Sequence, residues 1–567
     1  MRVRWLWFLI IFLPMAACDN SFQHERVRVK QTDPAPAKES AAHAKPSDIQ
    51  SNGSSKPSKR VMRAFYDGRH LVDPALGSDL SSSVALVNLY DSLVFPNERG
   101  GVDPWVAESW EVSKDGLTWT FHLRPDVFFH DGKKLTAADV RYSLHRLKAG
   151  NKGFASTFAN VDDVSVLNDT TISFVLKKPS ALFLPGLIRL YILNETLVKS
   201  HQLSNGEFGD QGDYGMGWLK NHDAGSGPYK LVDMKPDEYL LLEKNTHWWG
   251  RFTENAPDLF RMMTIPDPQV VRPMMINGHV EFGSHLDTIE NLEAQSKAKG
   301  VQIGLMPTLK ALYYSVNNRV APTDDVHMRR AMAHAIDYQA ILAQKWPGIR
   351  QSRGPVPAVL AGHKADVFTY SRDMVKARAE LAKSRYAMEL DKYPITMCWV
   401  AEAAFEERFA QIFKANMAEL GITVNVVETP WAEAVVKTSK LETSPHILIV
   451  YVGADIAEAG QMLFQRYHSS TAHTWMQNEW LLDPQLDKEI EDALVTMDTT
   501  ARYEKYAALQ EKIARLTPSF FIYDLLHPVA YRADYVDWPV VQGRTSPVTG
   551  YFHFAAHIGI NKMQKEN

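Results

Sequence analysis

The residues with the clearest chemical potential lie in the run Gly453-Ala-Asp-Ile-Ala-Glu458. The apolar run before it, 445–452, predicts a buried strand, so Asp455 comes just after the carboxyl end of that strand. In open α/β sheets, ligands bind at the carboxyl ends of the strands, so an acidic residue there is placed to face a cleft. The alternative is structural, with Asp455 as the N-cap of a helix that covers 458–464. Asp455 is therefore our candidate site residue.

The sequence lacks the common catalytic motifs. It contains no G-x-x-x-x-G-K-[ST] loop, no H-E-x-x-H, no C-x-x-C and no G-x-S-x-G. The 20 histidines are scattered without metal-ligand spacing. We therefore expect no catalytic residue, no metal site and no cofactor, although carboxylates that meet only through folding would leave no such motif.

Length and charge restrict the class of protein. A chain of 567 residues is too long for one hydrophobic core and predicts about three or four structural units. Its formal net charge of −4 argues against nucleic-acid binding, which usually needs a basic excess. Cys398 lies in an apolar run and is expected to be an inert buried thiol.

The N-terminus predicts export. Basic residues and a short apolar run precede Met15-Ala-Ala-Cys18, which resembles the lipobox of bacterial lipoproteins. Residues 1–18 are then a lipoprotein signal peptide that ends in a lipidated Cys18, and the alternative is a conventional signal peptide cut near Ala17. Asp19 resembles the signal that retains lipoproteins at the inner membrane. Residues 19–59 are rich in Ala, Pro, Ser and Lys without apolar periodicity, which predicts a flexible tether.

Strands and helices alternate beyond the tether. Leu117–Leu123 shows the period-two alternation of a half-buried strand. Thr136 and Asp139 predict the capped start of a helix. Val326–Ala343 predicts one amphipathic helix that is capped by Asp325.

The stretch 395–455 predicts the arrangement of the candidate site. Ile395–Val400 reads as a strand, and apolar residues at helical spacing from Phe409 to Leu420 follow it, with Gly421 as the stop signal. Ile422–Val427 reads as the next strand. A strand–helix–strand unit requires the first two strands to be parallel.

Several segments resemble the family 5 extracellular solute-binding proteins, which include the oligopeptide, dipeptide and nickel receptors of ABC importers. The densest match covers Trp105–Leu147 and is expected to describe the fold and not a binding site. The others are Leu71-Val-Asp-Pro74, Asn88-Leu-Tyr-Asp-Ser-Leu93, Gly225-Ser-Gly-Pro-Tyr229, Asn245-Thr-His-Trp-Trp249, Asn317 and Met328–Asp337.

The resemblance implies an α/β, two-lobed periplasmic-binding-protein fold (type II, cluster C) with an extra inserted domain. Domain I is expected to consist of 60–104, 221–317 and 526–567, domain II, the inserted one, of 105–220, and domain III of 318–525. The implied protein is a monomeric oligopeptide-binding lipoprotein of the periplasm, anchored at the inner membrane of a Gram-negative bacterium, where it serves an ABC permease.

In oligopeptide receptors the residue that corresponds to Asp455 pairs with the α-amino group of the peptide. Gly453 and Ala454 beside it are then expected to contact the ligand, because Gly453 would let a peptide backbone approach closely. Some relatives place a basic residue near position 449 for the ligand carboxylate, but Ile449 is apolar here. The partner of that carboxylate and the accepted peptide length are thus left open.

Two other functions fit the same resemblance. One is a receptor for a non-peptide ligand, such as a metal chelate, an opine or haem. The other is an envelope chaperone or signalling lipoprotein that uses the fold without transport. The identity of the bound species distinguishes the first from a peptide receptor, and the effect of gene deletion on uptake distinguishes the second.

Overall fold

The computed structural model describes residues 58–68, 70–264 and 267–563. The predicted signal peptide, Cys18, Asp19 and all of the predicted tether before residue 58 lie outside the described residues. No helix among the described residues is long and apolar enough to cross a membrane.

The first sheet has the strand order β1-β10-β9-β8. Its strands are β1 (Val61–Tyr66), β8 (Tyr229–Lys235), β9 (Tyr239–Lys244) and β10 (Leu259–Thr264). β1 and β10 are parallel and the other pairs are antiparallel. Helix α1 (Leu80–Leu89) packs beside this sheet, and its N-cap residue Asp79 accepts a hydrogen bond from the backbone N–H of Ser82.

The second sheet is fully antiparallel, with the order β4-β5-β7-β6. Its strands are β4 (Ala107–Val112), β5 (Thr118–Leu123), β6 (Val161–Asn168) and β7 (Thr171–Leu176). The alternating burial along β5 confirms the predicted half-buried strand. Helix α2 (Ala137–Gly150) covers the sheet, and the predicted capping box between Thr136 and Asp139 is present at its start.

The five-stranded sheet carries the candidate site. Its order is β13-β12-β14-β11-β15, with β11 (Val301–Val316), β12 (Ile395–Val400), β13 (Val424–Thr429), β14 (Ile447–Gly453) and β15 (Ser519–Arg532). β12 is parallel to β13, as the sequence predicts, and also parallel to β14. Helix α10 (Glu406–Ala418) connects β12 to β13, and Gly421 follows it at φ 76°, a conformation that favours glycine.

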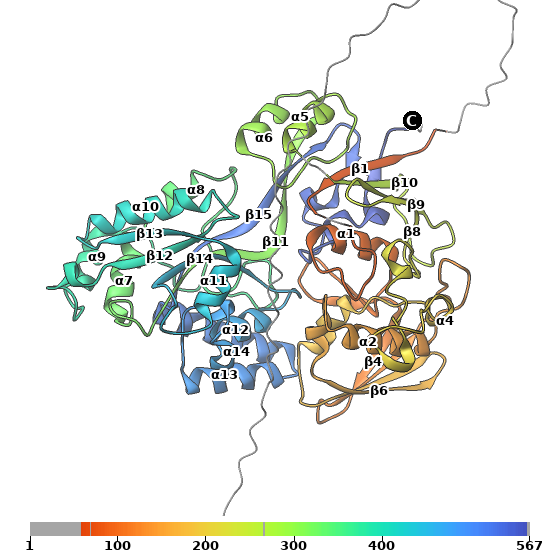
Figure 1. Cartoon of the computed structure of the whole chain (residues 1–567), viewed down its shortest axis with the longest axis horizontal. Helices are drawn as coiled ribbons and strands as arrows, with labels where there is room; N and C mark the ends of the chain where they lie inside the picture. The colour runs from red at the N-terminus through yellow and green to blue at the C-terminus, as the bar shows by residue number, and fades with distance from the viewer. Residues whose placement is uncertain (1–57, 69, 265–266, 564–567) are drawn as a thin grey trace, which may run out of the picture. The chain divides into compact units, whose positions relative to one another are not determined.

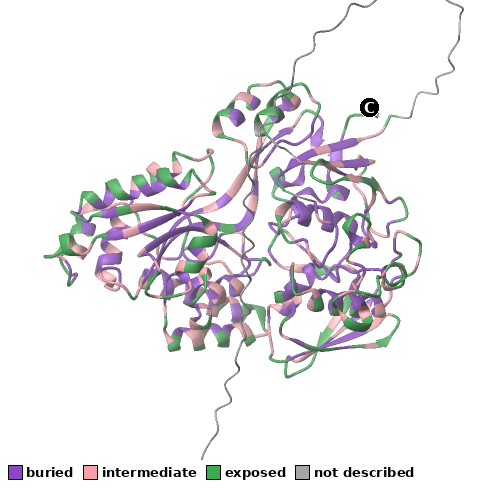
Figure 2. Ribbon diagram, viewed as in Figure 1, coloured by how far each residue is buried: buried purple, intermediate pink, exposed green. Residues whose placement is uncertain are grey.

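Both faces of this sheet are covered, because alternate side chains of β14 enter different cores. Leu448, Val450 and Val452 belong to the core that includes α12 (Ala459–Tyr467). Ile447 and Ile449 belong to the core that includes α10. Figure 1 shows α10 on one side of β12 and β13, with α11 (Trp431–Thr438) and α12 on the other, and Figure 2 shows the central strands as mainly buried. A strand buried on both faces reads as a continuous apolar run, which is why the sequence predicts it.

Strands β11 and β15 are long and pair along almost their whole length. The first half of β11 pairs with residues 526–532 of β15, and the second half pairs with 519–524 and with β14. β15 therefore continues across the predicted domain boundary near 525, whereas β11 ends at Val316, just before the predicted boundary near 317. The boundaries themselves remain a prediction.

Further α-helices and strands lie outside the elements described so far. The remaining helices are α3 (Phe183–Gly186), α4 (Glu195–Ser200), α5 (Pro268–Ile276), α6 (Ile289–Ser296), α9 (Met374–Leu381), α13 (Pro484–Val495) and α14 (Thr499–Leu516). The remaining strands are β2 (Val94–Pro96), β3 (Val102–Pro104), β16 (Val536–Asp537) and β17 (Gly559–Ile560).

The predicted single helix 326–343 is wrong, because the structure has two helices there. α7 (Val326–Ala335) begins at its predicted cap Asp325, and α8 (Tyr338–Leu342) follows after a break at Ile336 and Asp337. The Asp337 side chain accepts from the Ala340 N–H and starts a new helix, while its own N–H donates to Asn416 Oδ1 at 2.8 Å. An Asp side chain thus competes with the helix for backbone hydrogen bonds.

Several sequence segments that carry the family resemblance meet at one buried carboxylate. Asp91 accepts hydrogen bonds from Trp105 Nε1 at 2.8 Å, from Ser226 Oγ at 2.9 Å and from Trp249 Nε1 at 3.1 Å. Burial raises the pKa of the Asp91 carboxyl above its ordinary value. These segments therefore build the core near the first sheet, far along the chain from the candidate site.

Candidate functional site

Charged and aromatic residues lie at one edge of the five-stranded sheet. Because β12, β13 and β14 are parallel, the segments that follow them emerge at the same edge. Phe405 follows β12, Trp431 follows β13 and Asp455 follows β14. On the neighbouring antiparallel strand, Lys310 pairs with Gly453 and is exposed at the same edge.

Asp455 presents an exposed carboxylate, held by one neutral donor. Gln461 Nε2 donates to Asp455 Oδ2 at 3.2 Å, and no ion pair is found for this carboxylate among the residues that the structure describes. The Asp455 carbonyl accepts from Arg189 Nε at 3.0 Å, and Arg189 Nη1 donates to the Thr549 carbonyl at 3.1 Å. Asp455 therefore has room for a cationic partner.

The backbone around Asp455 is fixed by its neighbours. The Ala454 N–H donates to the Leu309 carbonyl at 3.2 Å, and the Ala457 carbonyl accepts from the Ala361 N–H at 3.0 Å. Packing also favours a glycine at position 453, because a Cβ there would lie 2.5 Å from the Lys310 side chain. Contacts of Gly453 and Ala454 with a ligand remain a prediction.

The alternative role of Asp455 as a helix cap does not fit the structure. The N-cap of α12 is Glu458, and its side chain makes no capping bond. Instead, Glu458 Oε1 accepts from Arg502 Nε at 2.8 Å and from the Tyr506 hydroxyl at 3.0 Å. Burial raises the pKa of Glu458, which marks it as a core residue and separates it from the exposed Asp455.

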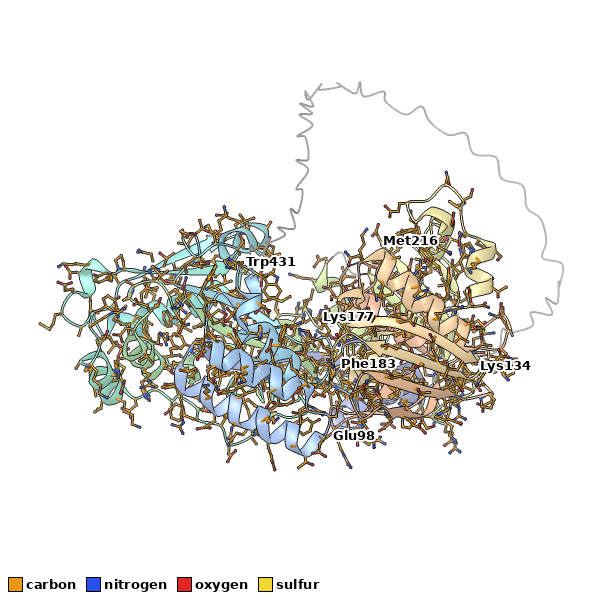
Figure 3. The ribbon with its side chains drawn as sticks, turned by 90° about the horizontal axis from the view of Figure 1, so that it is seen from below. Glu98, Lys134, Lys177, Phe183, Met216 and Trp431 are labelled. Carbon is orange, nitrogen blue, oxygen red and sulfur yellow. The ribbon has the colours of Figure 1, made fainter. Side chains whose placement is uncertain are left out.

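Aromatic rings flank this edge. Trp431 packs against Trp475 with ring centroids 4.9 Å apart, and its backbone N–H donates to Glu402 Oε2 at 2.9 Å. Figure 3 shows Trp431 at the margin of the part of the molecule that contains α11. Phe405 is exposed to 45% of its surface, which is high for such a large apolar side chain. Such rings suit the apolar parts of a ligand.

A partly buried lysine and a buried glutamate lie beside the loop after β12. The Lys345 ammonium lies 4.6 Å from the Phe405 ring centroid, and burial lowers its pKa to about 8. Glu406 accepts from the Val400 N–H at 3.0 Å, and burial raises the pKa of its carboxyl to about 8. Both shifts result from desolvation of the charged form.

Ile449 is fully buried, so this position of β14 cannot contact a ligand carboxylate. A cavity of about 360 Å³ is lined by β2, β3 and C-terminal residues, and Asp455 is not among them. We regard the strand edge as the candidate site, because it gathers the exposed charge and the aromatic rings.

The described residues offer no group of three or more His, Cys, Asp or Glu side chains that could hold a metal ion. Cys398 is buried, as the sequence predicts, and burial raises the pKa of its thiol. Neither finding assigns a further chemical role to this edge.

Comparison with known proteins now adds to this geometry. Residues 101–474 match the family described as "Bacterial extracellular solute-binding proteins, family 5 Middle". The chain belongs to this family. Its members are solute-binding proteins, and the predicted two-lobed α/β fold is confirmed by the match and by solved structures of similar fold.

Relatives of this family member carry names that refer to different ligands. It is 26% identical over 450 residues to the "Probable D,D-dipeptide-binding periplasmic protein DdpA" of Escherichia coli, covering 78% of this chain and 83% of that protein. It is also 26% identical over 377 residues to "Heme-binding protein A" of Haemophilus influenzae, covering 61% of this chain and 65% of that protein. The solved structure of DppA from Helicobacter pylori in complex with the peptide STSA has a TM-score of 0.68 at 24% identity, covering 89% of this chain and 99% of that one.

Sequence reasoning predicted Asp455 as a site residue but missed the residues that hold it. Gln461 lies three residues after the helix cap Glu458, the spacing of a capping box, and this pattern could have drawn attention to it. Arg189 gave no such signal, because its partners Asp455 and Thr549 lie 266 and 360 residues away.

Proposed function

We propose that this protein is the periplasmic substrate-binding lipoprotein of an ABC importer that captures oligopeptides and delivers them to a membrane permease. The proposed site is the carboxyl edge of β12, β13 and β14. Asp455 pairs with the peptide's α-amino group, and Gly453 and Ala454 lie along its backbone. The observation that carries this assignment is the exposed carboxylate without an ionic partner in the described part of the chain.

The chemistry of the edge supports a peptide. An ammonium that enters a closing cleft needs a carboxylate partner, because burying it unpaired costs several kcal/mol. Backbone amides bind a peptide independently of its side chains, and ordered waters adapt to side chains of different size. The names of the dipeptide-binding relative and of the STSA complex point to the same ligand class.

We also propose the remaining organisation. Residues 1–18 are a signal peptide that ends in the lipidated Cys18, and 19–59 form a tether to the inner membrane. The protein acts as a monomer without catalysis or a cofactor. Domain I comprises 60–104, 221–317 and 526–567, domain II 105–220 and domain III 318–525, with β11 and β15 as the connection that permits hinge closure.

Identification of the natural ligand tests this proposal directly. Native mass spectrometry of the freshly purified, detergent-solubilised protein should show masses of bound peptides, which fragmentation then sequences. A co-purifying haem, metal chelate or opine would overturn the peptide assignment and favour the ligand class of the haem-binding relative. An unchanged rate of peptide uptake after gene deletion would refute a transport role and favour a chaperone or a signalling protein.

A further inference from the structure

The side chain of Gln461 holds the loop that presents Asp455. Its Oε1 accepts from the Asp455 N–H at 2.9 Å and from the Ile456 N–H at 3.1 Å. Its Nε2 donates to Asp455 Oδ2 at 3.2 Å. One amide group therefore fixes both the backbone and the carboxylate of the same residue.

The orientation of this amide is set by its partners. Two backbone N–H groups can donate only to the oxygen of the glutamine amide, so the nitrogen must face the carboxylate. A flipped amide would place its NH₂ against two donors and its oxygen against a carboxylate, and it would lose all of these hydrogen bonds.

The position of Gln461 in the helix makes the hold rigid. Gln461 lies in the first turn of α12, three residues after the N-cap Glu458. Gly460 beside it packs against Tyr506, and a Cβ added at Gly460 would lie 2.2 Å from the Tyr506 hydroxyl oxygen. The first turn of α12 therefore lies close to α14. The helix is thus a fixed support from which the side chain reaches back to the loop.

We propose that Gln461 is the positioning residue of the ammonium site, and that it determines the preference for ligands with a free amino group. The proposal rests on the proposed function of Asp455. Gln461 acts through Asp455, since it orients the carboxylate and leaves its remaining lone pairs free for the ligand. A neutral donor suits this task, because a Lys or Arg here would neutralise the charge that the ligand needs.

A purely structural role is the competing explanation. If Gln461 only stabilised the start of α12, its loss would weaken the binding of every ligand to a similar degree. If it positions the carboxylate, its loss would act on free-amine ligands and leave N-acetylated ones almost unchanged. The ratio of the two affinities therefore separates these roles.

The test uses the full chain and a synthetic pool of random-sequence tripeptides, free or N-acetylated, in equilibrium dialysis read by mass spectrometry. Gln461→Met removes all three hydrogen bonds and should weaken free-amine binding about tenfold, with little effect on the acetylated pool. Gln485→Met is the matched control, because Gln485 also lies in a first helical turn and donates to a carboxylate, Glu489, at 2.9 Å.

The outcomes separate this proposal from the function it rests on. In the Asp455→Ala background, Gln461→Met should have no further effect on the free-amine pool. An equal loss for both pools, or an effect that persists without Asp455, would overturn the positioning role. A wild-type protein that binds neither pool, or an Asp455→Ala variant without an amine-specific loss, would instead refute the proposed function.

Discussion

Replacing Asp455 by Ala should weaken the binding of free-amine peptides strongly while the fold stays intact. The carboxylate is exposed and its side-chain partner among the described residues is the amide of Gln461, so its removal leaves no charged protein group unpaired. When the cleft closes on a peptide, the ammonium loses water and then lacks its ionic partner. Removing one member of such a desolvated pair costs roughly 2–5 kcal/mol, or about 30-fold to several thousand-fold in affinity.

Calorimetry with one peptide in two forms decides between ligand pairing and a structural role. The N-acetylated form has no ammonium, so it should bind wild type poorly and be almost insensitive to Asp455→Ala. Asp483→Ala is the matched control, because Asp483 caps α13 by accepting from the N–H groups of Gln485 and Leu486 at 3.0 and 3.1 Å. Should Asp455→Ala weaken both forms equally, as expected of a purely structural role, the pairing with the amino group is wrong.

Other parts of the chain give independent predictions. Wild type should incorporate radiolabelled fatty acid and fractionate with the inner membrane, while Cys18→Ser should not be labelled. Unlabelled wild-type protein would contradict lipidation at Cys18. Labelled protein in the outer membrane would contradict only the role of Asp19. The buried Arg146 forms an ion pair with Asp73, with Nη1 2.6 Å from Oδ1, and Asp73→Ala leaves Arg146 without this ionic partner. The substitution should lower the free energy of unfolding by about 3–5 kcal/mol in denaturant titrations. A loss below about 1 kcal/mol would contradict this. Burial raises the folded-state pKa of Glu406 from 4.5 to about 8, so the folded protein retains a proton that the unfolded chain releases, and stability falls as the pH rises between these values. Glu406→Gln should remove this fall and be more stable than wild type at pH 8 by on the order of 3–5 kcal/mol, but not at pH 4, and parallel stability profiles would refute it.

The sequence predicted those elements whose signals are local. The strand–helix–strand unit at 395–429 combines apolar runs, helical spacing and a glycine stop, and all of these agree with the structure. The capping box at Thr136 is local in the same sense, since its two side chains lie one helical turn apart. Where local preference and tertiary packing agree, pattern reasoning succeeds.

Failures arose where distant groups compete for the backbone. Nothing in the apolar spacing of 326–343 shows that Asn416 takes the N–H of Asp337 and that the helix breaks there. The role of Arg189 at the candidate site was equally hidden, because its partners become neighbours only after folding. A sequence pattern can single out a candidate ligand residue such as Asp455, but it does not show a distant group such as Arg189 that holds it in the fold.

The segments that show the family resemblance do not reveal the ligand, and the structure gives the physical reason. Asp91 is buried and accepts from two indoles and a hydroxyl, so a change in any partner leaves a buried polar group unsatisfied at a cost of about 1–3 kcal/mol. Such a network constrains the fold whatever ligand is bound. At the strand edge, by contrast, Asp455 and Lys310 are exposed, and their replacement costs the fold little. One fold can therefore serve relatives named for dipeptides and for haem, and we expect specificity to depend on the proposed site at the edge and on the residues that position it.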